Sequence, residues 1–201
     1  MKKITLIITF VTIIVFVSGC KNATKPESVV ANYLKAFKSF DLEKAASYTV
    51  SKTDPLLVLN VDIDKNDLAL YNFYKSNAKK LTFKIKESRS YDSNAVVFVH
   101  CKYIDGTKFY ERVIGEYLLR AMQFDFNGSN DDYDDLLNNV LKEMIPSFKS
   151  VYTERLIRLD CIKIDDVWMI EKITDDMGDI LTLNLITVTN ELGNLFHNPI
   201  H

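Results

Sequence analysis

The pattern of hydrophobic and polar residues after residue 25 begins with the period of an amphipathic helix. In Pro26–Ser39 apolar side chains recur every three or four positions, and a proline suits the first turn because its missing N–H needs no partner there. The same spacing predicts a short helix over Leu42–Tyr48, which Asp41 can cap, and a further helix over Lys65–Asn77. Between them, Ser51–Asp64 fits either a helical turn or an extended linker, because its apolar run is too short to decide.

The period then changes to two, which is typical of strands. Apolar and polar residues alternate over about residues 81–91, and a second strand follows over Ala95–Ile104, after the turn residues Asp92-Ser93-Asn94. These two strands are expected to form a hairpin. The second has apolar residues on both sides, which predicts a central strand covered on both faces or nearly so. Two later strands are predicted over Tyr152–Ile164 and Val167–Ile173.

Helical periodicity returns between the second and third strands, where we expect an inserted helical hairpin over about residues 110–150. Its first helix has an apolar stripe over Val113–Met122 and its second over Tyr133–Phe148, with a polar loop between them. A last helix is predicted over Met177–Leu192, with Gly193 as its C-cap. The elements together predict an α+β fold, with an antiparallel sheet of about four strands packed on the N-terminal helices.

The first twenty residues have a pattern of their own. Lys2 and Lys3 precede an apolar run over Ile4–Val17, and the small residues Ser18-Gly19 stand directly before Cys20. The run is shorter than the about 20 residues that a membrane-spanning helix needs. This segment resembles the lipobox export signal of bacterial lipoproteins. The resemblance implies cleavage before Cys20 and a diacylglycerol thioether on that cysteine, while a plain cleaved signal and an uncleaved signal anchor remain alternatives.

The chain is therefore expected to divide into three parts: a lipoprotein signal peptide at residues 1–19, the lipidated cysteine and a tether at residues 20–25, and a single domain at residues 26–201. The signal holds two of the 25 basic residues and no acidic one, so the remainder carries 23 basic against 27 acidic residues, a net charge of −4. A mildly acidic chain without a basic run does not suit nucleic acid, and no nucleic-acid partner is expected.

Two cysteines remain besides the lipidated one. Cys101 and Cys161 each lie in a strand pattern and alternate with large apolar residues, which is typical of buried free thiols. An exported location permits a disulfide between them. If their strands pair antiparallel with facing midpoints, however, the two cysteines lie at opposite ends of the pair, too far apart for a disulfide.

The acidic stretch at residues 125–135 invites interpretation as a calcium-binding loop, because hard cations prefer clustered oxygens. The loop template is not met. Counting from Asp125, Asn130 stands where the loop needs glycine and Leu136 where it needs glutamate. Acidic residues at the start of a helix are better explained by capping and by the helix dipole, so we predict no metal site.

The histidines do not point to catalysis. His100 lies in the middle of a predicted strand, with no carboxylate or nucleophile motif near it in the sequence, and is interpreted as a histidine at the surface or at a pocket edge. His197 and His201 lie near the C-terminus without the spacing of zinc ligands. The sequence therefore predicts no catalytic residue and no cofactor.

Several stretches carry a resemblance to a fold family. They are Val-Val-Ala-Asn-Tyr-Leu-Lys-Ala-Phe at 29–37, Phe-Asp-Leu-Glu-Lys-Ala-Ala-Ser-Tyr at 40–48, Leu-Thr-Phe-Lys-Ile-Lys at 81–86, Asn-Ala-Val-Val-Phe-Val at 94–99 and Asp-Asp-Val-Trp-Met-Ile at 165–170. Together they resemble small Gram-positive lipoproteins with a domain of the ketosteroid isomerase / nuclear transport factor 2-like (cystatin-like) superfamily. The resemblance implies a curved, cone-like sheet around a pocket, whose mouth the inserted hairpin is placed to cover, and it supplies no catalytic residue.

Two functions from different classes are compatible with these features. The first is a binding or interaction domain without evident catalysis, held by its lipid on the extracytoplasmic face of the cell membrane, with an unknown protein or small-ligand partner. The second is a cone-fold enzyme or carrier that acts on a small apolar molecule. The pocket distinguishes them, because acid–base work needs an open cavity in which tyrosine, histidine and carboxylate side chains converge.

Overall fold

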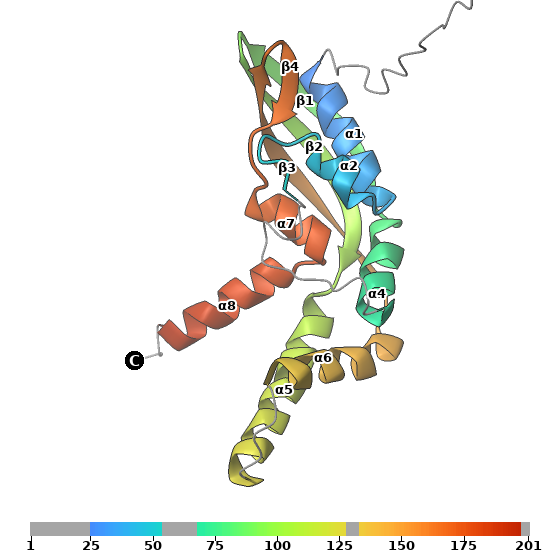
Figure 1. The fold of residues 1–201 in the computed structure, drawn as a ribbon, viewed down its shortest axis with the longest axis vertical. Helices are drawn as coiled ribbons and strands as arrows, with labels where there is room; N and C mark the ends of the chain where they lie inside the picture. The colour runs from blue at the N-terminus through green and yellow to red at the C-terminus, as the bar shows by residue number, and fades with distance from the viewer. Residues whose placement is uncertain (1–24, 54–67, 128–132, 198–201) are drawn as a thin grey trace, which may run out of the picture.

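An open antiparallel sheet of four strands organises the fold, in the order β1-β2-β3-β4 (Figure 1). The computed structural model describes residues 25–53, 68–127 and 133–197. β1 (Thr82–Tyr91) pairs with β2 (Asn94–Asp105), β2 with β3 (Val151–Ile164), and β3 with β4 (Val167–Ile170). The predicted α+β fold with an antiparallel sheet of about four strands is confirmed.

Helices precede, interrupt and follow the sheet. Their bounds are α1 Pro26–Lys38, α2 Leu42–Ala46, α4 Leu68–Ala78, α5 Thr107–Asn127, α6 Tyr133–Met144, the 3-10 turn η1 Ile145–Ser147, α7 Asp175–Thr182 and α8 Leu185–His197. Asp41 caps α2 as predicted, because its side chain accepts a hydrogen bond from the Lys44 N–H at 3.1 Å. Most of Ser51–Asp64 lies outside the described residues. Among the helices that are described, none combines the length and the apolar character needed to cross a membrane.

One face of the sheet carries the hydrophobic core. Helix α1 packs against β1, β2 and β4, and α7 against β2 (Figure 1). On this face Val97, Val99, Ile157 and Leu159 are fully buried. The segment after α2 extends the sheet beside β4, since the Val50 N–H donates to the Ile170 carbonyl at 2.9 Å. This parallel contact covers the edge of β4 that would otherwise be free to pair with another strand.

The opposite face of the sheet is open to solvent. On it Val96, Phe98 and His100 are only partly buried, and Leu156 is 57% exposed. The prediction that β2 is a central strand is confirmed, because it pairs with both β1 and β3, but the prediction that it is covered on both faces or nearly so is wrong. An antiparallel sheet can leave one face in water, and here charged neighbours accompany the apolar ones: the Arg89 guanidinium lies over the Phe98 ring at 5.8 Å.

The inserted helices leave the sheet where β2 ends and return where β3 begins. The β2–β3 ladder runs without interruption to the pair Asp105–Val151, so α5 and α6 take the place of a hairpin turn. They project beyond the end of the sheet as an arm (Figure 1). The expectation that this hairpin covers the mouth of a pocket in the sheet is not met, because α5 packs against α6 and α8 and not over the strands.

The C-terminal region differs from the prediction. The helix expected over Met177–Leu192 is two helices, α7 and α8, separated by Leu183 and Asn184, whose φ angles of 59° and 69° are left-handed. Gly193, expected as the C-cap, lies inside α8. Asn184 stabilises the break, because it is buried and its side chain accepts a hydrogen bond from Tyr103 and donates one to Asp105. The helical spacing of apolar residues continues across the break, so the sequence pattern does not reveal it.

The cysteines occupy the predicted positions. Cys101 pairs in register with Arg155, and Cys161 with Ala95, so the two thiols are separated by the length of six residues along the strands, about 20 Å. Both are free and buried. Burial raises the pKa of each thiol to about 12, and nearby negative charge adds to the effect at Cys161.

These thiols are expected to be unreactive in the folded protein at pH 8 and to react fully after denaturation without reductant. A pKa of about 12 leaves almost no thiolate at that pH, and the thiolate is the reactive form. Titration with an aromatic disulfide reagent checks this. Two thiols that react at once in the folded chain would contradict their burial, and none after denaturation would show that the strand register is wrong.

Candidate functional site

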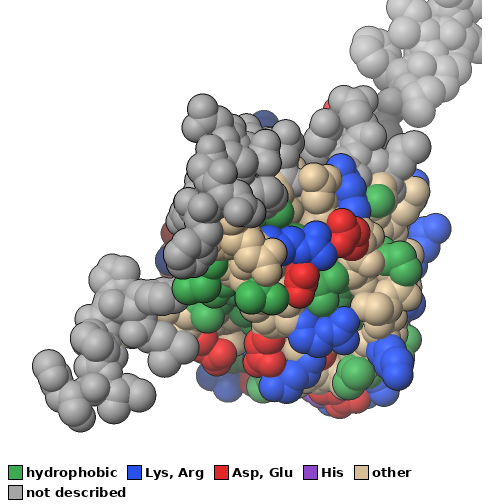
Figure 2. All heavy atoms as spheres, turned by 90° about the horizontal axis from the view of Figure 1, so that it is seen from below, with side chains coloured by type: hydrophobic (Ala, Val, Ile, Leu, Met, Phe, Trp, Pro, Cys, Tyr) green, Lys and Arg blue, Asp and Glu red, His purple; other side chains and the backbone are tan. Residues whose placement is uncertain are grey.

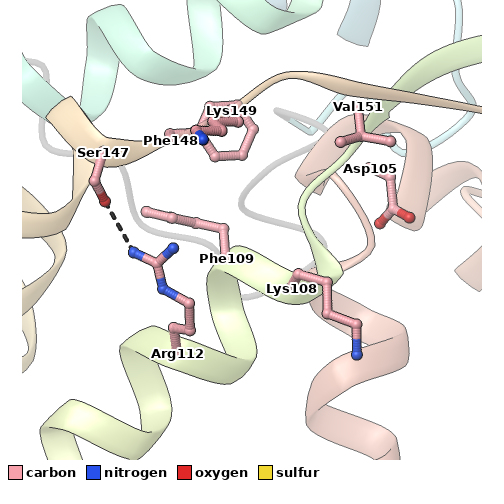
Figure 3. A pocket seen from close by; sticks show the side chains of 8 residues that line it. All are labelled: Asp105, Lys108, Phe109, Arg112, Ser147, Phe148, Lys149 and Val151. Atoms are coloured by element: carbon pink, nitrogen blue, oxygen red, sulfur yellow. Dashed lines mark hydrogen bonds between the residues drawn. The ribbon is translucent and has the colours of Figure 1, made fainter.

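A groove lies where the arm leaves and re-enters the sheet. It has a volume of about 260 Å³ and is formed by the end of β2, the first turns of α5, the end of η1 and the start of β3 (Figure 3). These segments are about forty residues apart in the chain and meet because Asp105 and Val151 close the β2–β3 ladder. The groove is lined by Asp105, Lys108, Phe109, Arg112, Ser147, Phe148, Lys149 and Val151.

Aromatic side chains make the apolar part of the groove. The rings of Phe109 and Phe148 lie 5.1 Å apart in an edge-to-face arrangement, and both contact Phe73 of α4. Phe109 is 5% exposed, so its ring is fixed by packing, while Val151 is 59% exposed at the outer edge. Aromatic pairs in such edge-to-face or tilted arrangements add about 0.5–1.5 kcal/mol per pair beyond area burial. The floor is therefore a firm apolar surface.

Three basic side chains surround that floor. The Arg112 guanidinium donates to the Ser147 hydroxyl at 2.9 Å, which holds it across the groove beside Phe109 (Figure 3). Lys149 adjoins Phe148, and Lys108 stands at the outer edge, where it pairs with Glu111 at 2.9 Å. With one carboxylate among the lining residues, the groove is net positive in a chain that is net negative.

That carboxylate, Asp105, is already committed to the fold. Its oxygen accepts hydrogen bonds from the Thr107 N–H at 2.9 Å, which caps α5, and from the Asn184 side-chain amide at 2.9 Å. Burial raises the pKa of Asp105, but the hydrogen bonds from Thr107 and Asn184 and the charge of Arg155 outweigh it and hold the pKa below its usual value. Asp105 is therefore ionised at neutral pH and is a weak base.

Buried tyrosines tie this end of the sheet to the C-terminal helices. The Tyr103 hydroxyl donates to Asn184 at 2.7 Å, and the Tyr110 hydroxyl donates to the Thr182 carbonyl at 2.9 Å while bonding Tyr74 at 2.9 Å. Burial raises the pKa of Tyr103 to about 12 and that of Tyr110 well above 10. They are neutral hydrogen-bonding groups, and they fix the base of α5 on which the groove is built.

Close backbone packing completes this junction at Gly106. Its N–H donates to the Leu183 carbonyl at 2.9 Å, and a Cβ at this position would lie 2.7 Å from that carbonyl oxygen. Only glycine allows the start of α5 to approach the α7–α8 break this closely. The left-handed break and the groove thus depend on the same contact.

The residues singled out in the sequence lie elsewhere. Cys20 and the whole signal segment are outside the described residues, as are His201 and residues 128–132 of the acidic stretch. His100 is on the open face of the sheet, 37% exposed, with its Nε2 3.3 Å from a Glu154 oxygen, so the strand pairing brings it a carboxylate that chain order does not. Within the described ranges, no three His, Cys, Asp or Glu side chains cluster in a way that could hold a metal ion.

The groove was missed by reasoning from sequence because its residues belong to two distant segments. Phe148 belongs to the apolar stripe of the second predicted helix, whereas Phe109 precedes the stripe of the first. Nothing in the chain order brings Lys108 and Phe109 next to Phe148 and Lys149. The available signal was weak: basic and aromatic residues directly follow the end of β2 and directly precede β3.

Other hollows are less defined. One of about 450 Å³ lies beside α2 and is lined by residues that include Phe40, Glu43 and Tyr71, and one of about 400 Å³ lies along residues 172–176. None of these three hollows is lined by Tyr33 of α1 or Tyr103 of β2, which are almost fully buried.

The surface at the arm end carries mixed charge. Viewed from the end of the molecule that α5 and α6 reach, basic side chains stand beside hydrophobic ones, with acidic side chains between them (Figure 2). Positive charge is therefore confined to small areas such as the groove. A ligand would be attracted there by contacts with individual side chains more than by a broad electrostatic field.

No family model matches the chain, and no curated protein matches it. One similar solved structure is YcdA of Bacillus subtilis, provisionally described as a lipoprotein: it has 11% identity and a TM-score of 0.37, with 79% of this chain and 46% of that one covered. This chain thus spans about half the length of that protein, and with so low a TM-score the likeness carries no argument about fold or function.

Proposed function

We propose that this chain is a lipoprotein of the extracytoplasmic face of the cell membrane, whose domain binds a partner and does not act as a catalyst. The observation that carries the proposal is the order of features at the N-terminus. A basic pair, a short apolar run and small residues end at Cys20, and six positions later Pro26 begins α1. A lipid on Cys20 would hold the domain close to the bilayer, because two or three acyl chains anchor a protein stably.

The shape of the molecule supports a role in binding. α1 begins at one end of the long axis, and the arm reaches the other end (Figure 1). Residues 20–25 can span at most about 20 Å when fully extended. Attachment at one end thus leaves the groove and the arm accessible to a partner outside the cell.

The chemistry of the groove also favours binding. The pKa of its carboxylate, Asp105, lies below the usual value, and that carboxylate already accepts hydrogen bonds from Thr107 and Asn184. It is therefore poorly suited to accept a proton from a substrate. The basic side chains and the aromatic floor can hold a ligand by charge and by apolar contact, without any chemical change in the ligand. Membership of the ketosteroid isomerase / nuclear transport factor 2-like superfamily is part of the proposal, supported by the order of helices and strands.

The attachment is tested with Cys20→Ser in cells grown with a labelled fatty acid. The wild-type chain should take up label and sediment with membranes, whereas Cys20→Ser should take up none and keep its signal segment, because only a thiol forms the thioether. Cys161→Ala is the matched control, since Cys161 is a buried free cysteine of the domain, and it should be labelled like the wild type. Label on Cys20→Ser would overturn the proposal.

A further inference from the structure

We infer that the groove at the base of the arm binds a carboxylate carried on an apolar stem of about the size of one amino-acid side chain. This inference rests on the proposed function, since it names the ligand class of a binding domain. It combines three properties of the groove: a small volume, a rigid aromatic floor and an excess of positive charge at the edge.

The volume sets the size of the apolar stem. At about 260 Å³, the groove is slightly smaller than the about 300–1,000 Å³ of cavities that hold a complete drug-sized molecule. A phenyl or branched aliphatic group fits this space, resting on the Phe109 and Phe148 rings and against Val151. The rings are held by their contacts with Phe73, so the floor needs little rearrangement to accept it.

The cations set the sign of the ligand. Arg112 uses one nitrogen on Ser147, which fixes the guanidinium over the groove and leaves its other N–H groups for a planar, two-oxygen acceptor. Lys149 lies opposite, and Lys108 is 89% exposed in a pair with Glu111, an arrangement that costs little to break. A cationic ligand would meet three like charges, so an anion is the matching class.

Asp105 makes a singly charged carboxylate a better fit than a phosphate. Phosphates commonly bind the free N–H groups at the start of a helix, but Asp105 already accepts from Thr107 at the start of α5. Its negative charge also lines the groove and would repel a dianion more strongly than a monoanion. The two sources of such a carboxylate are a free organic acid and the C-terminal residue of a polypeptide.

The experiment uses the complete lipoprotein purified in detergent and ligand-observed saturation-transfer NMR. The probes are N-acetyl-phenylalanine, its uncharged amide, phenyl phosphate and the tripeptide N-acetyl-Ala-Ala-Phe. N-acetyl-phenylalanine should bind at least tenfold more tightly than the amide and more tightly than phenyl phosphate, and its binding should weaken with salt. Tighter binding of the tripeptide indicates a polypeptide end as the source, whereas equal binding indicates a free acid.

Variants place the binding in the groove. The double variant Arg112→Gln, Lys149→Gln should bind N-acetyl-phenylalanine at least tenfold more weakly, because both charge-assisted contacts are lost. Arg120→Gln is the matched control, since Arg120 lies on the same helix but pairs with Glu116 and Glu143, and it should bind as the wild type does. Val151→Glu, at a 59% exposed position, adds a negative charge that repels the ligand and should also weaken binding. An unchanged thermal melting temperature establishes that each variant is folded.

Equal binding of acid and amide, preference for phenyl phosphate, or unchanged binding by both groove variants would overturn the inference. A saturation-transfer signal that is equally strong in micelles without protein would also overturn the inference. The proposed lipid attachment can fail independently of this inference, because fatty-acid labelling of Cys20 does not depend on the groove.

Discussion

Trp168→Ala is expected to lower the free energy of unfolding by about 3–5 kcal/mol, the range for removing a large aromatic side chain from a core. Trp168 is 7% exposed in β4, in register with Lys163, and lies on the helix-covered side of the sheet together with Ile170 and Cys161. This burial makes Trp168 a core residue. Its removal leaves a cavity in the core on the helix-covered side of the sheet.

Chemical denaturation followed by circular dichroism measures this loss. Tyr91→Ala is the control, since Tyr91 is an aromatic strand residue that is 64% exposed, and it should change stability by less than about 1 kcal/mol. A loss below about 1 kcal/mol for Trp168→Ala as well would mean that this residue contributes no core packing.

Asp179→Ala should cost about 3–5 kcal/mol, because it removes the buried partner of an ion pair and leaves Arg155 with only the exposed Asp176. The Asp179 carboxylate is 4% exposed, accepts from Arg155 at 2.7 Å and from the Thr187 N–H at 2.9 Å, and is also bonded by the Thr187 hydroxyl. It therefore joins β3, α7 and α8. Because Arg155 is 31% exposed, water can partly solvate it in the variant, which places the expected loss toward the lower end of that range.

Asp176→Ala provides a control on the same arginine. Asp176 is 3.2 Å from Arg155 but 57% exposed, and pairs of this kind contribute about 0–1 kcal/mol. The two variants should differ by at least about 2 kcal/mol in denaturation midpoint analysis. Equal losses would show that the buried carboxylate is not a structural joint between the sheet and the last two helices.

Local patterns predicted the elements whose physics is local. α1 ends one residue before the expected end, because its apolar stripe stops where Phe40 takes a left-handed φ of 59°. The β1–β2 hairpin follows from alternation and turn residues. The positions of Cys101 and Cys161 at opposite ends of the β2–β3 pair follow from antiparallel register alone.

Features that depend on tertiary contacts were not predictable in the same way. The break between α7 and α8 sits within a continuous helical pattern and is held by Asn184, whose partners Tyr103 and Asp105 are about eighty residues away. The open face of β2 has apolar residues that a pattern cannot distinguish from buried ones. The groove likewise requires that Asp105 and Val151 be adjacent, which is a property of the ladder and not of either segment.

The central claim, that Cys20 holds this domain at the membrane, is tested most directly by mass spectrometry of the protein purified from bacterial membranes. The expected result is a chain that begins at Cys20 and carries the mass of a diacylglycerol, with or without a further acyl chain on its amine. An unmodified chain that begins at another residue, or a chain that retains Met1, would contradict the account.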